Sequence, residues 1–467
     1  MEPSKNNALR ELRGARKFGY NFGYFGMYLG NMLISVFVFQ FYVYTINLSS
    51  LLVSIGVFLQ LFLGALFSIV IGVIIDNKKP NRLGKRRPFL FYGLPIWAIT
   101  TVLIFLPPWY CPKNNAFYLP VTLFLWVLLI ANAIASGSIL VAHASMLPEQ
   151  SQTLKNRSSV AANGTLLTII ASIFVMLFPL IIQSVLEDPE NLKWWEPSGK
   201  ILILYIPIIA LIFAIIGVIG IASAFFSVDE SFYMSAKSIK IEKKSLKKTF
   251  QQMKVPYNDK KYRTFLMVGF NTQFASKVIG IVIMPFLIYV VMFYGTTFLI
   301  YVLVAIVCKF GWFYFWRKNQ VKYDLIRAYR LCLIASIIAS AFELLFLIQI
   351  LSFEMRVALF VTTYGTVLGS MYAYGLFNTP LACALVDESA ERIDQNKKEK
   401  AVSEISGSYF GINGFMQSLG QALASIFVGL FLIGANEENQ VVITIIMVSA
   451  GLFYLFALIY LIKMRRK

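Results

Sequence analysis

Four ionisable side chains lie within long apolar stretches of the sequence, and they are the first candidates for chemistry. They are Lys277, Lys309, Glu343 and His143, the single histidine of the chain. An ionisable group at the centre of a membrane helix costs about 3 kcal/mol or more, so such groups usually mark a solute or ion pathway. Their presence indicates a binding or ion-coupling site inside a membrane domain.

Lys277 is the strongest of these candidates. Gln273 precedes it by one helical turn and shares its face. The Lys277 ammonium can attract an anionic group of a solute or take the place of a coupling cation. The alternative is a structural lysine, paired with Glu404 or with a helix C-terminus.

The other three candidates each have a structural alternative. Glu343 is a candidate proton carrier, or a residue with a structural or lipid-interface role. Lys309 is about two turns from the end of its stretch, near enough for its stem to snorkel to the membrane surface. His143 shares a helical stripe with Asn132 and Ser136, so it is either a proton-coupling group or a satisfied structural donor.

Two stretches carry hydroxyl and amide side chains at near-helical spacing, which is typical of an amphipathic cavity wall. Ordinary packing with interfacial tyrosines is the equal alternative. The first stretch holds Tyr24, Tyr28, Asn31, Ser35 and Tyr42, and the second holds Tyr364, Tyr372, Tyr374 and Asn378.

The elements that must position these residues are membrane helices. The chain has 467 residues, 58% of them apolar, and a mean hydropathy of +0.70, which is more apolar surface than one soluble core can bury. In lipid every backbone polar group must be satisfied within the segment, so long apolar runs predict helices. Twelve spans are predicted, at 18–46, 51–75, 89–107, 117–147, 159–183, 201–226, 263–292, 294–316, 328–352, 355–385, 403–433 and 440–462.

The net charge of +19 reports the orientation of these spans. With the N-terminus inside, 36 of the 42 Lys and Arg residues fall in inner loops and tails, which is the positive-inside pattern. The basic residues are not interleaved with exposed aromatics, so no nucleic-acid partner is expected. We expect a multi-pass protein of the cell membrane, with both termini cytoplasmic and with membrane lipid as a partner.

The sequence lacks the motifs of enzymes and pumps. The four cysteines are scattered and show neither metal-ligand spacing nor a disulfide framework. There is no Walker loop, no His/Cys cluster and no nucleophile elbow. We therefore expect no enzyme activity, no cofactor and no metal site.

The most informative motif runs from Gly72 through Asp76, Arg82 and Gly84 to Arg86 and Pro88. It resembles the signature of the major facilitator superfamily, and the physics fits a gate. Gly72 permits close helix approach, Asp76 can accept hydrogen bonds, and the basic cluster holds the inner face. The alternative, an ordinary basic inner loop, explains the charges but not the spacing.

Further stretches resemble one branch of that superfamily, the melibiose permease-like glycoside-pentoside-hexuronide:cation symporters. The matching stretches are 17–26, 82–90, 145–149 with Arg157, 387–388, 408–412 and 419–423. The resemblance implies an all-α fold of twelve transmembrane helices in two six-helix pseudo-repeats, and cation-coupled transport of sugars.

The chain departs from that family at its charged positions. The cation-binding carboxylates of the second helix are replaced by the stretch 63–68, where Ser68 is the remaining side-chain oxygen. The family's sugar-binding acid on the first helix would fall near Met27 or Tyr28, its acid on the fourth helix near Leu140, and its lysine on the eleventh helix near Ser418. A less polar solute is therefore a second possibility.

Together these features predict a secondary transporter that moves a small solute, a sugar or glycoside, coupled to H⁺ or Na⁺. Residues 1–226 and 263–467 are expected as two six-helix halves, joined by a basic linker at 227–262. The cavity is expected between the spans 18–46, 117–147, 263–292 and 355–385. The alternatives are a lipid, amphiphile or drug transporter of the same fold, and a receptor or scaffold that does not transport.

The candidate site residues follow from these patterns. For solute binding they are Lys277, Gln273, Asn31, Tyr28, Asn132, Ser136, Asn378 and Tyr372. For coupling they are Ser68, His143 and Glu343, and for gating Gly72, Asp76, Arg82, Gly84 and Arg86.

Overall fold

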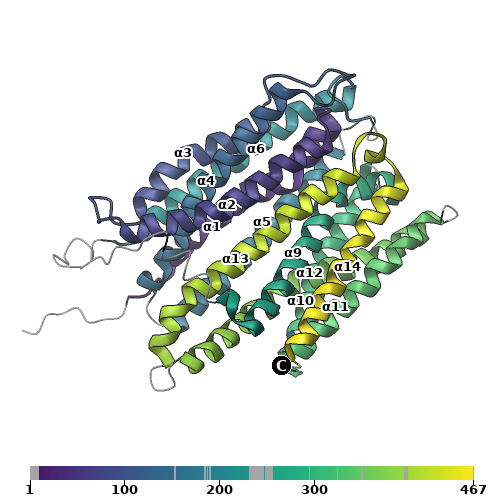
Figure 1. The fold of residues 1–467 in the computed structure, drawn as a ribbon. Coiled ribbons are helices and arrows are strands. Elements are labelled where there is room, and N and C mark those ends of the chain that lie inside the picture. The colour runs from purple at the N-terminus through teal and green to yellow at the C-terminus, as the bar shows by residue number, and fades with distance from the viewer. Residues whose placement is uncertain are drawn as a thin grey trace, which may run out of the picture.

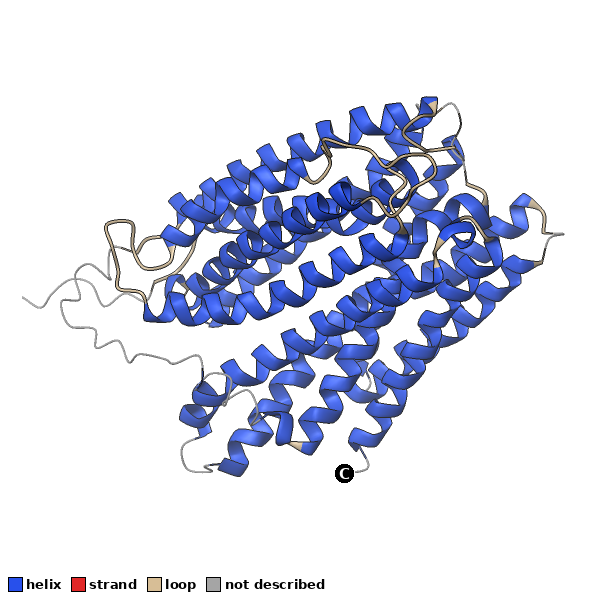
Figure 2. Cartoon of the chain, turned by 45° about the horizontal axis from the view of Figure 1, so that its top comes forward, coloured by secondary structure: helices blue, strands red, loops and turns tan. Residues whose placement is uncertain are grey.

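The computed structural model describes residues 10–465, apart from 152–153, 184–185, 187, 189–190, 231–246, 248–255, 294, 323, 349–350 and 394–397. Within this part the chain forms helices and no strands (Figure 2). The long helices are α1 (Gly14–Gln40), α2 (Ser50–Asn77), α3 (Arg87–Leu103), α4 (Leu119–Gln150), α5 (Leu154–Gln183), α6 (Pro197–Ser227), α9 (Lys260–Pro285), α10 (Phe298–Lys322), α11 (Leu325–Phe342), α12 (Phe353–Ile393), α13 (Lys398–Phe431) and α14 (Gln440–Arg465).

These helices coincide with the twelve predicted spans, so the all-α polytopic fold is confirmed. In the described residues, nine of them are both long and apolar enough to cross a membrane. The others are α3, which has 17 residues, α5, whose apolar part is Leu166–Phe178, and α12.

The two sets of six helices lie side by side in Figure 1, α1 to α6 in one group and α9 to α14 in the other. The proposed boundaries at 226 and 263 fall near the end of α6 and the start of α9. Most of the linker, including Lys243, Lys244 and Lys248, lies outside the described residues.

The first helix of each group ends in the same way. α1 continues into a π-helical segment, Phe41–Thr45, and α9 continues into another, Phe286–Val291. Each is followed closely by a residue with positive φ, Asn47 at 67° and Met292 at 63°. Equivalent irregularities at equivalent places are what two related repeats would produce.

Small residues set the spacing between neighbouring helices. A Cβ added at Gly26 of α1 would lie 2.7 Å from the Gly217 Cα of α6, and one at Gly420 of α13 would lie 2.4 Å from the Phe270 carbonyl of α9. Such close backbone approach is the usual packing device in membranes, where lipid provides no hydrophobic drive for helix association. The glycines therefore hold α1 against α6 and α13 against α9.

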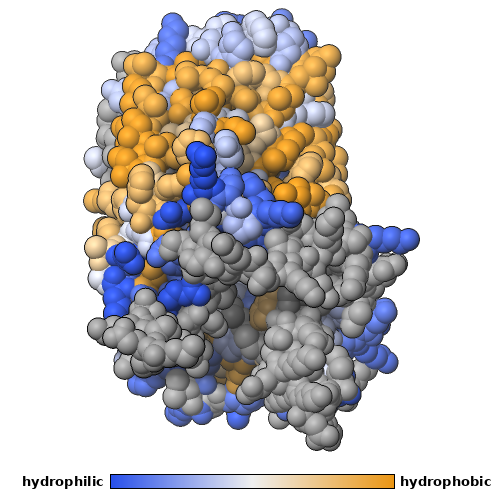
Figure 3. Space-filling model, turned by 90° about the vertical axis from the view of Figure 1, so that its left-hand side faces the viewer, coloured by the Kyte–Doolittle hydropathy of each residue, from blue (hydrophilic) through white to orange (hydrophobic). Residues whose placement is uncertain are grey.

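The outer faces of the bundle are apolar. On α6 a stripe of residues spaced by three or four positions stays 44 to 60% exposed: Leu204, Ile208, Leu211, Ile215 and Ile219. Figure 3 shows hydrophobic side chains over a broad band of the surface, with hydrophilic side chains above and below it. This band has the form of a lipid-facing belt.

All twelve helices run between the same two ends of the bundle. We call the end that holds Gly14, Asn77, Lys260 and Arg465 the basic end, because most Lys and Arg residues gather there. The opposite end, with the loops after α1, α5 and α13, is the far end. Asp259 starts α9 at the basic end by accepting hydrogen bonds from the backbone N–H groups of Lys261 (2.9 Å) and Tyr262 (3.2 Å).

Candidate functional site

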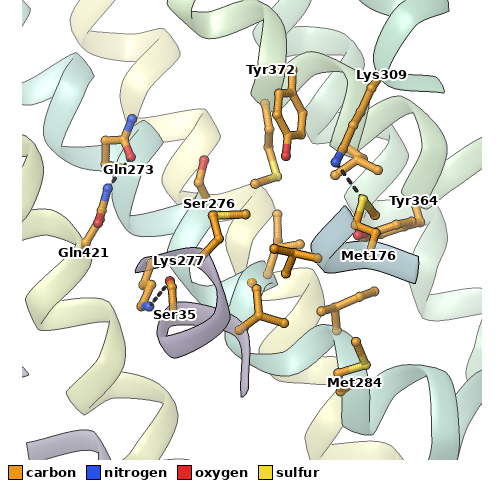
Figure 4. Close-up of a pocket in the computed structure, with 18 of the residues that line it drawn as sticks. Ser35, Met176, Gln273, Ser276, Lys277, Met284, Lys309, Tyr364, Tyr372 and Gln421 are labelled. Atoms are coloured by element: carbon orange, nitrogen blue, oxygen red, sulfur yellow. Dashed lines mark hydrogen bonds between the residues drawn. The ribbon is translucent and has the colours of Figure 1, made fainter. Parts of the chain in front are cut away.

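A cavity of about 460 Å³ lies between the two helix groups and forms the main chamber of the site. It is walled by α1 and α5 on one side and by α9, α10, α12 and α13 on the other (Figure 4). Methionine, valine, leucine and isoleucine side chains make much of the wall. Its polar lining consists of Tyr28, Ser35, Gln273, Ser276, Lys277, Tyr301, Lys309, Tyr364, Tyr372 and Gln421.

Lys277 lies in this wall, as its position along the sequence predicts for a cavity residue. Its Nζ donates a hydrogen bond of 3.0 Å to Ser35 Oγ, and the residue is 9% exposed. No carboxylate of the described residues forms an ion pair with it. The alternative of a structural pair with Glu404 does not fit. Gln421 of α13 lies beside Gln273, which is one helical turn from Lys277. Position 404 is about 25 Å along α13 from Gln421, too far for such a pair.

Lys309 also lies in the cavity, so the expectation of a snorkelling lysine is wrong. The residue is 5% exposed, and its ammonium lies 4.5 Å from the ring centroid of Tyr372. It lies 2.7 Å from Met176 Sδ and 3.4 Å from Ser172 Oγ, both on α5. Lys309 is thus a second buried ammonium with neutral partners.

A second chamber of about 260 Å³ adjoins the first and shares Ser35 and Lys277 with it. The chamber is lined by residues of α1, α2, α4, α9 and α13, among them Asn31, Ser68 and Ser136. Asn31 Oδ1 accepts a hydrogen bond from Trp97 Nε1 (3.2 Å), while Ser68 donates to the Gly64 carbonyl (2.8 Å).

This second chamber is a poor Na⁺ site. No Asp or Glu is among the described residues that line it, and the Lys277 ammonium adds a positive charge to it. Hard cations are normally held by several oxygen ligands that include carboxylates. The residues present therefore do not fit the coupling cation that the family resemblance implies.

An amide pair in the wall of the main chamber, on the same side as Lys277 in Figure 4, joins α9 to α13. Gln421 Nε2 donates to Gln273 Oε1 at 2.7 Å. Tyr28 of α1 and Tyr372 of α12 complete the predicted residues that the cavity brings together.

Two of the residues predicted to bind solute lie outside both chambers. Asn132 donates to the hydroxyls of Thr100 (3.0 Å) and Thr101 (3.1 Å) between α3 and α4. Asn378 accepts from the Tyr329 hydroxyl (3.0 Å) between α11 and α12. These contacts tie neighbouring helices and leave both residues away from the cavity.

His143 is packed between α1 and α4. Its Nε2 lies 2.8 Å from the Tyr20 carbonyl, and the Tyr20 hydroxyl donates to the His143 carbonyl at 2.7 Å. The two rings stack with centroids 4.1 Å apart. This reciprocal pairing accounts for the histidine structurally and does not place it on a cavity wall.

Glu343 lies inside the second helix group, so the lipid-interface alternative is wrong, whereas a structural role fits its burial. It begins the short 3₁₀ segment Glu343–Leu347 after α11, and the residue is 1% exposed. Its Oε1 has no hydrogen-bond partner among the described residues. It is near enough to interact electrostatically with Tyr454 and with Tyr364, which lines the main chamber.

The gating motif between α2 and α3 is tied to its own helix group. Glu230, after α6, accepts hydrogen bonds from the backbone N–H groups of Arg86 and Arg87, and Arg86 Nη1 donates to the Ser145 carbonyl of α4. Gly84 has a φ of +104°, and a Cβ there would lie 2.0 Å from Glu230 Oε2. Glu230 thus caps α3 and requires glycine at position 84.

The structure does not show the predicted gating contacts for the remaining gate residues, Gly72, Arg82 and Asp76. A Cβ at Gly72 would meet Val141 Cγ1 at 3.9 Å, which is ordinary contact, so no close helix approach depends on this glycine. Arg82 is exposed. The Asp76 side chain lies outside the described residues.

The two helix groups are bonded to each other at the far end. The Ser50 hydroxyl at the start of α2 bonds to the carbonyls of Gly429 (3.2 Å) and Leu432 (2.5 Å), and the Tyr44 hydroxyl donates to the Glu437 carbonyl at 2.8 Å. All hydrogen bonds between the groups, among the described residues, fall in the middle or at the far end of the helices. This arrangement closes the cavity toward the far end.

A charged cluster borders this closure. The Glu437 carboxylate accepts from the Ser50 backbone N–H, and the Lys193 ammonium lies nearby with Glu438. Burial raises the pKa of the Glu437 carboxyl to about 7, although Lys193 partly offsets the rise. Burial likewise lowers the pKa of Lys193.

Several cavity residues were not predicted. Ser172 and Met176 on α5, Tyr301 on α10 and Gln421 on α13 all line the chambers or contact a lysine there. The sequence signal was weak, because many polar residues of the apolar spans do not face a cavity. The predicted α1, α4, α9 and α12 do contribute, and α2, α5, α10 and α13 join them.

The sequence of this chain matches one known protein family over most of its length. The family described as MFS/sugar transport protein matches residues 19–466. The search of curated proteins found no match.

Solved structures share the fold at low sequence identity. The nucleoside transporter NupG is 12% identical, with a TM-score of 0.63 and coverage of 97% of this chain and 99% of its own. A bacterial homolog of the human lysosomal transporter Spinster, in an inward-facing conformation, is 14% identical, with a TM-score of 0.61 and coverage of 97% and 96%. The inward-open xylose transporter XylE from E. coli is 15% identical, with a TM-score of 0.58 and coverage of 97% and 94%.

Proposed function

The chain belongs to the MFS/sugar transport protein family of the major facilitator superfamily, and we propose that it moves a small polar solute across the cell membrane by alternating access. It is a multi-pass membrane transporter and not an enzyme. We place its basic end, with both termini, in the cytoplasm. The observation that carries the proposal is a polar cavity between two helix groups that is closed toward the far end.

The transport cycle follows from this closure. The far-end contacts of Ser50 and Tyr44 must break when the cavity opens outward, and the two helix groups must then meet at the basic end. Residues 1–226 and 263–467 are the two halves that rock against each other, joined by the linker at 227–262.

The preferred solute is a sugar or a similarly hydroxylated compound. Tyr28, Tyr301 and Tyr364 bring aromatic rings and hydroxyls to the main chamber, and Gln273 and Gln421 bring amides. Such groups suit a hydroxylated ring, which needs convergent donors and acceptors. The cavity of about 460 Å³ is within the usual range for small-molecule sites.

The proposed coupling ion is H⁺. The second chamber lacks a described carboxylate for Na⁺, whereas Glu343 is a buried carboxyl inside the half that carries both lysines. A conformational change that wets Glu343 would let it exchange a proton.

Proteoliposomes test this function directly. Labelled sugars should accumulate under an inward pH gradient, and Glu343→Gln should abolish accumulation while leaving exchange of internal for external sugar. Glu354→Gln, an exposed far-end residue, is the matched control. Accumulation driven by Na⁺ alone, or full pH-driven accumulation by Glu343→Gln, would refute H⁺ coupling through this residue.

A second candidate is transport of an amphiphile. The main chamber has an apolar wall that includes Met32, Met284 and Met371, and methionine adapts to irregular chains. Uptake of labelled lysolipids but of no sugar would support this candidate against the first.

A further inference from the structure

The charge of the cavity is unbalanced. Its two chambers are lined by two lysines, Lys277 and Lys309, and by no Asp or Glu among the described residues. Figure 4 shows the two lysines on different sides of the main chamber, with the Lys277 ammonium beside Ser35 at its edge and the Lys309 ammonium beside Met176. The cavity therefore has positive charge without an internal counter-charge.

Each lysine bonds to a neutral partner on the opposite helix group. Lys277 belongs to α9 and reaches Ser35 on α1 at 3.0 Å, while Lys309 belongs to α10 and reaches Met176 on α5 at 2.7 Å. A thioether and a serine hydroxyl are weak partners for an ammonium ion. A buried charge is normally paired with an opposite charge, because leaving it unpaired is costly.

We propose that the solute is an organic anion whose carboxylate or phosphate is bound between Lys277 and Lys309. This inference rests on the proposed transport function and names the class of its solute. The anion replaces Ser35 and Met176 as partner of the two ammonium groups. Because these partners belong to the other helix group, anion binding also releases two contacts that join the groups.

The other residues of the cavity wall indicate the chemistry of the rest of the solute. The tyrosine hydroxyls and the Gln273–Gln421 pair suit hydroxyl groups, and the methionines suit an apolar edge or chain. A sugar acid or sugar phosphate fits the tyrosine hydroxyls and the amide pair. An anionic lysolipid fits these polar groups and also the methionines. The shared requirement is one anionic group on a small organic molecule.

Thermal unfolding of the full chain in nanodiscs, with matched solutes, tests the proposal. The probes are glucose, glucuronate, glucose 6-phosphate, lysophosphatidic acid, lysophosphatidylcholine and inorganic phosphate. At least one organic anion should raise the midpoint, and glucose should not. A response to glucose 6-phosphate or glucuronate assigns a soluble solute, and a response to lysophosphatidic acid alone assigns a lipid.

Variants at the two lysines provide the second measurement. Lys277→Gln and Lys309→Gln should each weaken binding of the responding anion about ten- to hundredfold, because a hydrogen bond to a charged group is lost. Lys277→Arg and Lys309→Arg should retain most of it. Lys260→Gln and Lys318→Gln change exposed lysines of the same two helices and should have no effect.

Two results overturn the proposal. If glucose stabilises the protein as well as its anionic analogues, the transport function survives and the anionic solute does not. If no organic anion stabilises it, or if the lysine variants bind like the wild type, the anion site is rejected. Failure of every solute in both stabilisation and uptake would reject the transport function as well.

Discussion

The Lys277 ammonium of α9 and the Ser35 hydroxyl of α1 form a hydrogen bond of 3.0 Å across the boundary between the two helix groups. The pair lies where both chambers of the cavity meet. The same hydrogen bond therefore involves a charged group of the site and connects the two helix groups.

Ser35→Ala should separate these two roles. Loss of the hydroxyl leaves the buried ammonium without its described partner and should cost about 1 to 3 kcal/mol of stability. Binding of a stabilising anion should persist, because the ammonium is still present. Thermal unfolding with and without glucose 6-phosphate measures both effects, and equal loss of anion binding in Ser35→Ala and Lys277→Gln would contradict this assignment.

Gly429→Ala should disrupt closure of the far end. A Cβ at this position would lie 2.2 Å from Ser54 Oγ of α2, so the helices must separate, at a cost of about 1 to 3 kcal/mol. The variant should unfold at a lower temperature and expose a cysteine introduced at Ser54 to soluble maleimide.

Gly414→Ala on the same helix is the control for this test. Nothing lies within 4 Å of a Cβ at Gly414, so the substitution should be neutral or slightly stabilising. Equal destabilisation by both variants would show that helix α13 does not make its closing contact at Gly429.

Closure of the far end should depend on pH through Glu437. Its pKa is raised by burial from 4.5 to about 7, so the closed form favours the protonated carboxyl. The resulting stability is complete below pH 4.5 and is lost as the pH rises through about 7. The unfolding midpoint of the wild type should therefore be higher at pH 5 than at pH 8.

Glu437→Gln should reduce this difference between pH 5 and pH 8. Glu438→Gln, which changes the exposed neighbour, should keep it. The role of Glu437 is excluded if its variant shows the same pH profile as the wild type.

Cysteine labelling of intact cells should establish the orientation. In a background without native cysteines, Lys200→Cys at the far end should react with an impermeant maleimide, and Lys318→Cys at the basic end should not. Both positions are exposed in the structure, so a difference in labelling reports the side of the membrane rather than burial in the protein. The reverse pattern would invert the proposed topology.

The native thiol at the far end should itself react little with an impermeant maleimide. Burial raises the pKa of Cys111 to about 12, so its reactive thiolate is scarce at neutral pH. Wild-type cells should therefore show little outside labelling at this residue.

The sequence alone determined the helices and the family. Lipid requires about twenty apolar residues per span, so hydropathy locates each helix without knowledge of its neighbours. The stretch from Gly72 to Pro88 indicated the superfamily, and the matched family confirms it. Lys277, Gln273 and Tyr28 were also expected at the cavity, since polar groups in apolar spans rarely face lipid.

Only the tertiary structure decided which face of each helix meets which neighbour. A helix apolar on all sides gives no periodic signal of its lipid face, so the directions of Lys309 and Glu343 could not be read from their spacing. The same limit hid the reciprocal pairing of His143 with Tyr20 and the cap that Glu230 places on α3. Those contacts join residues more than a hundred positions apart, and their geometry is set by helix packing rather than by local sequence.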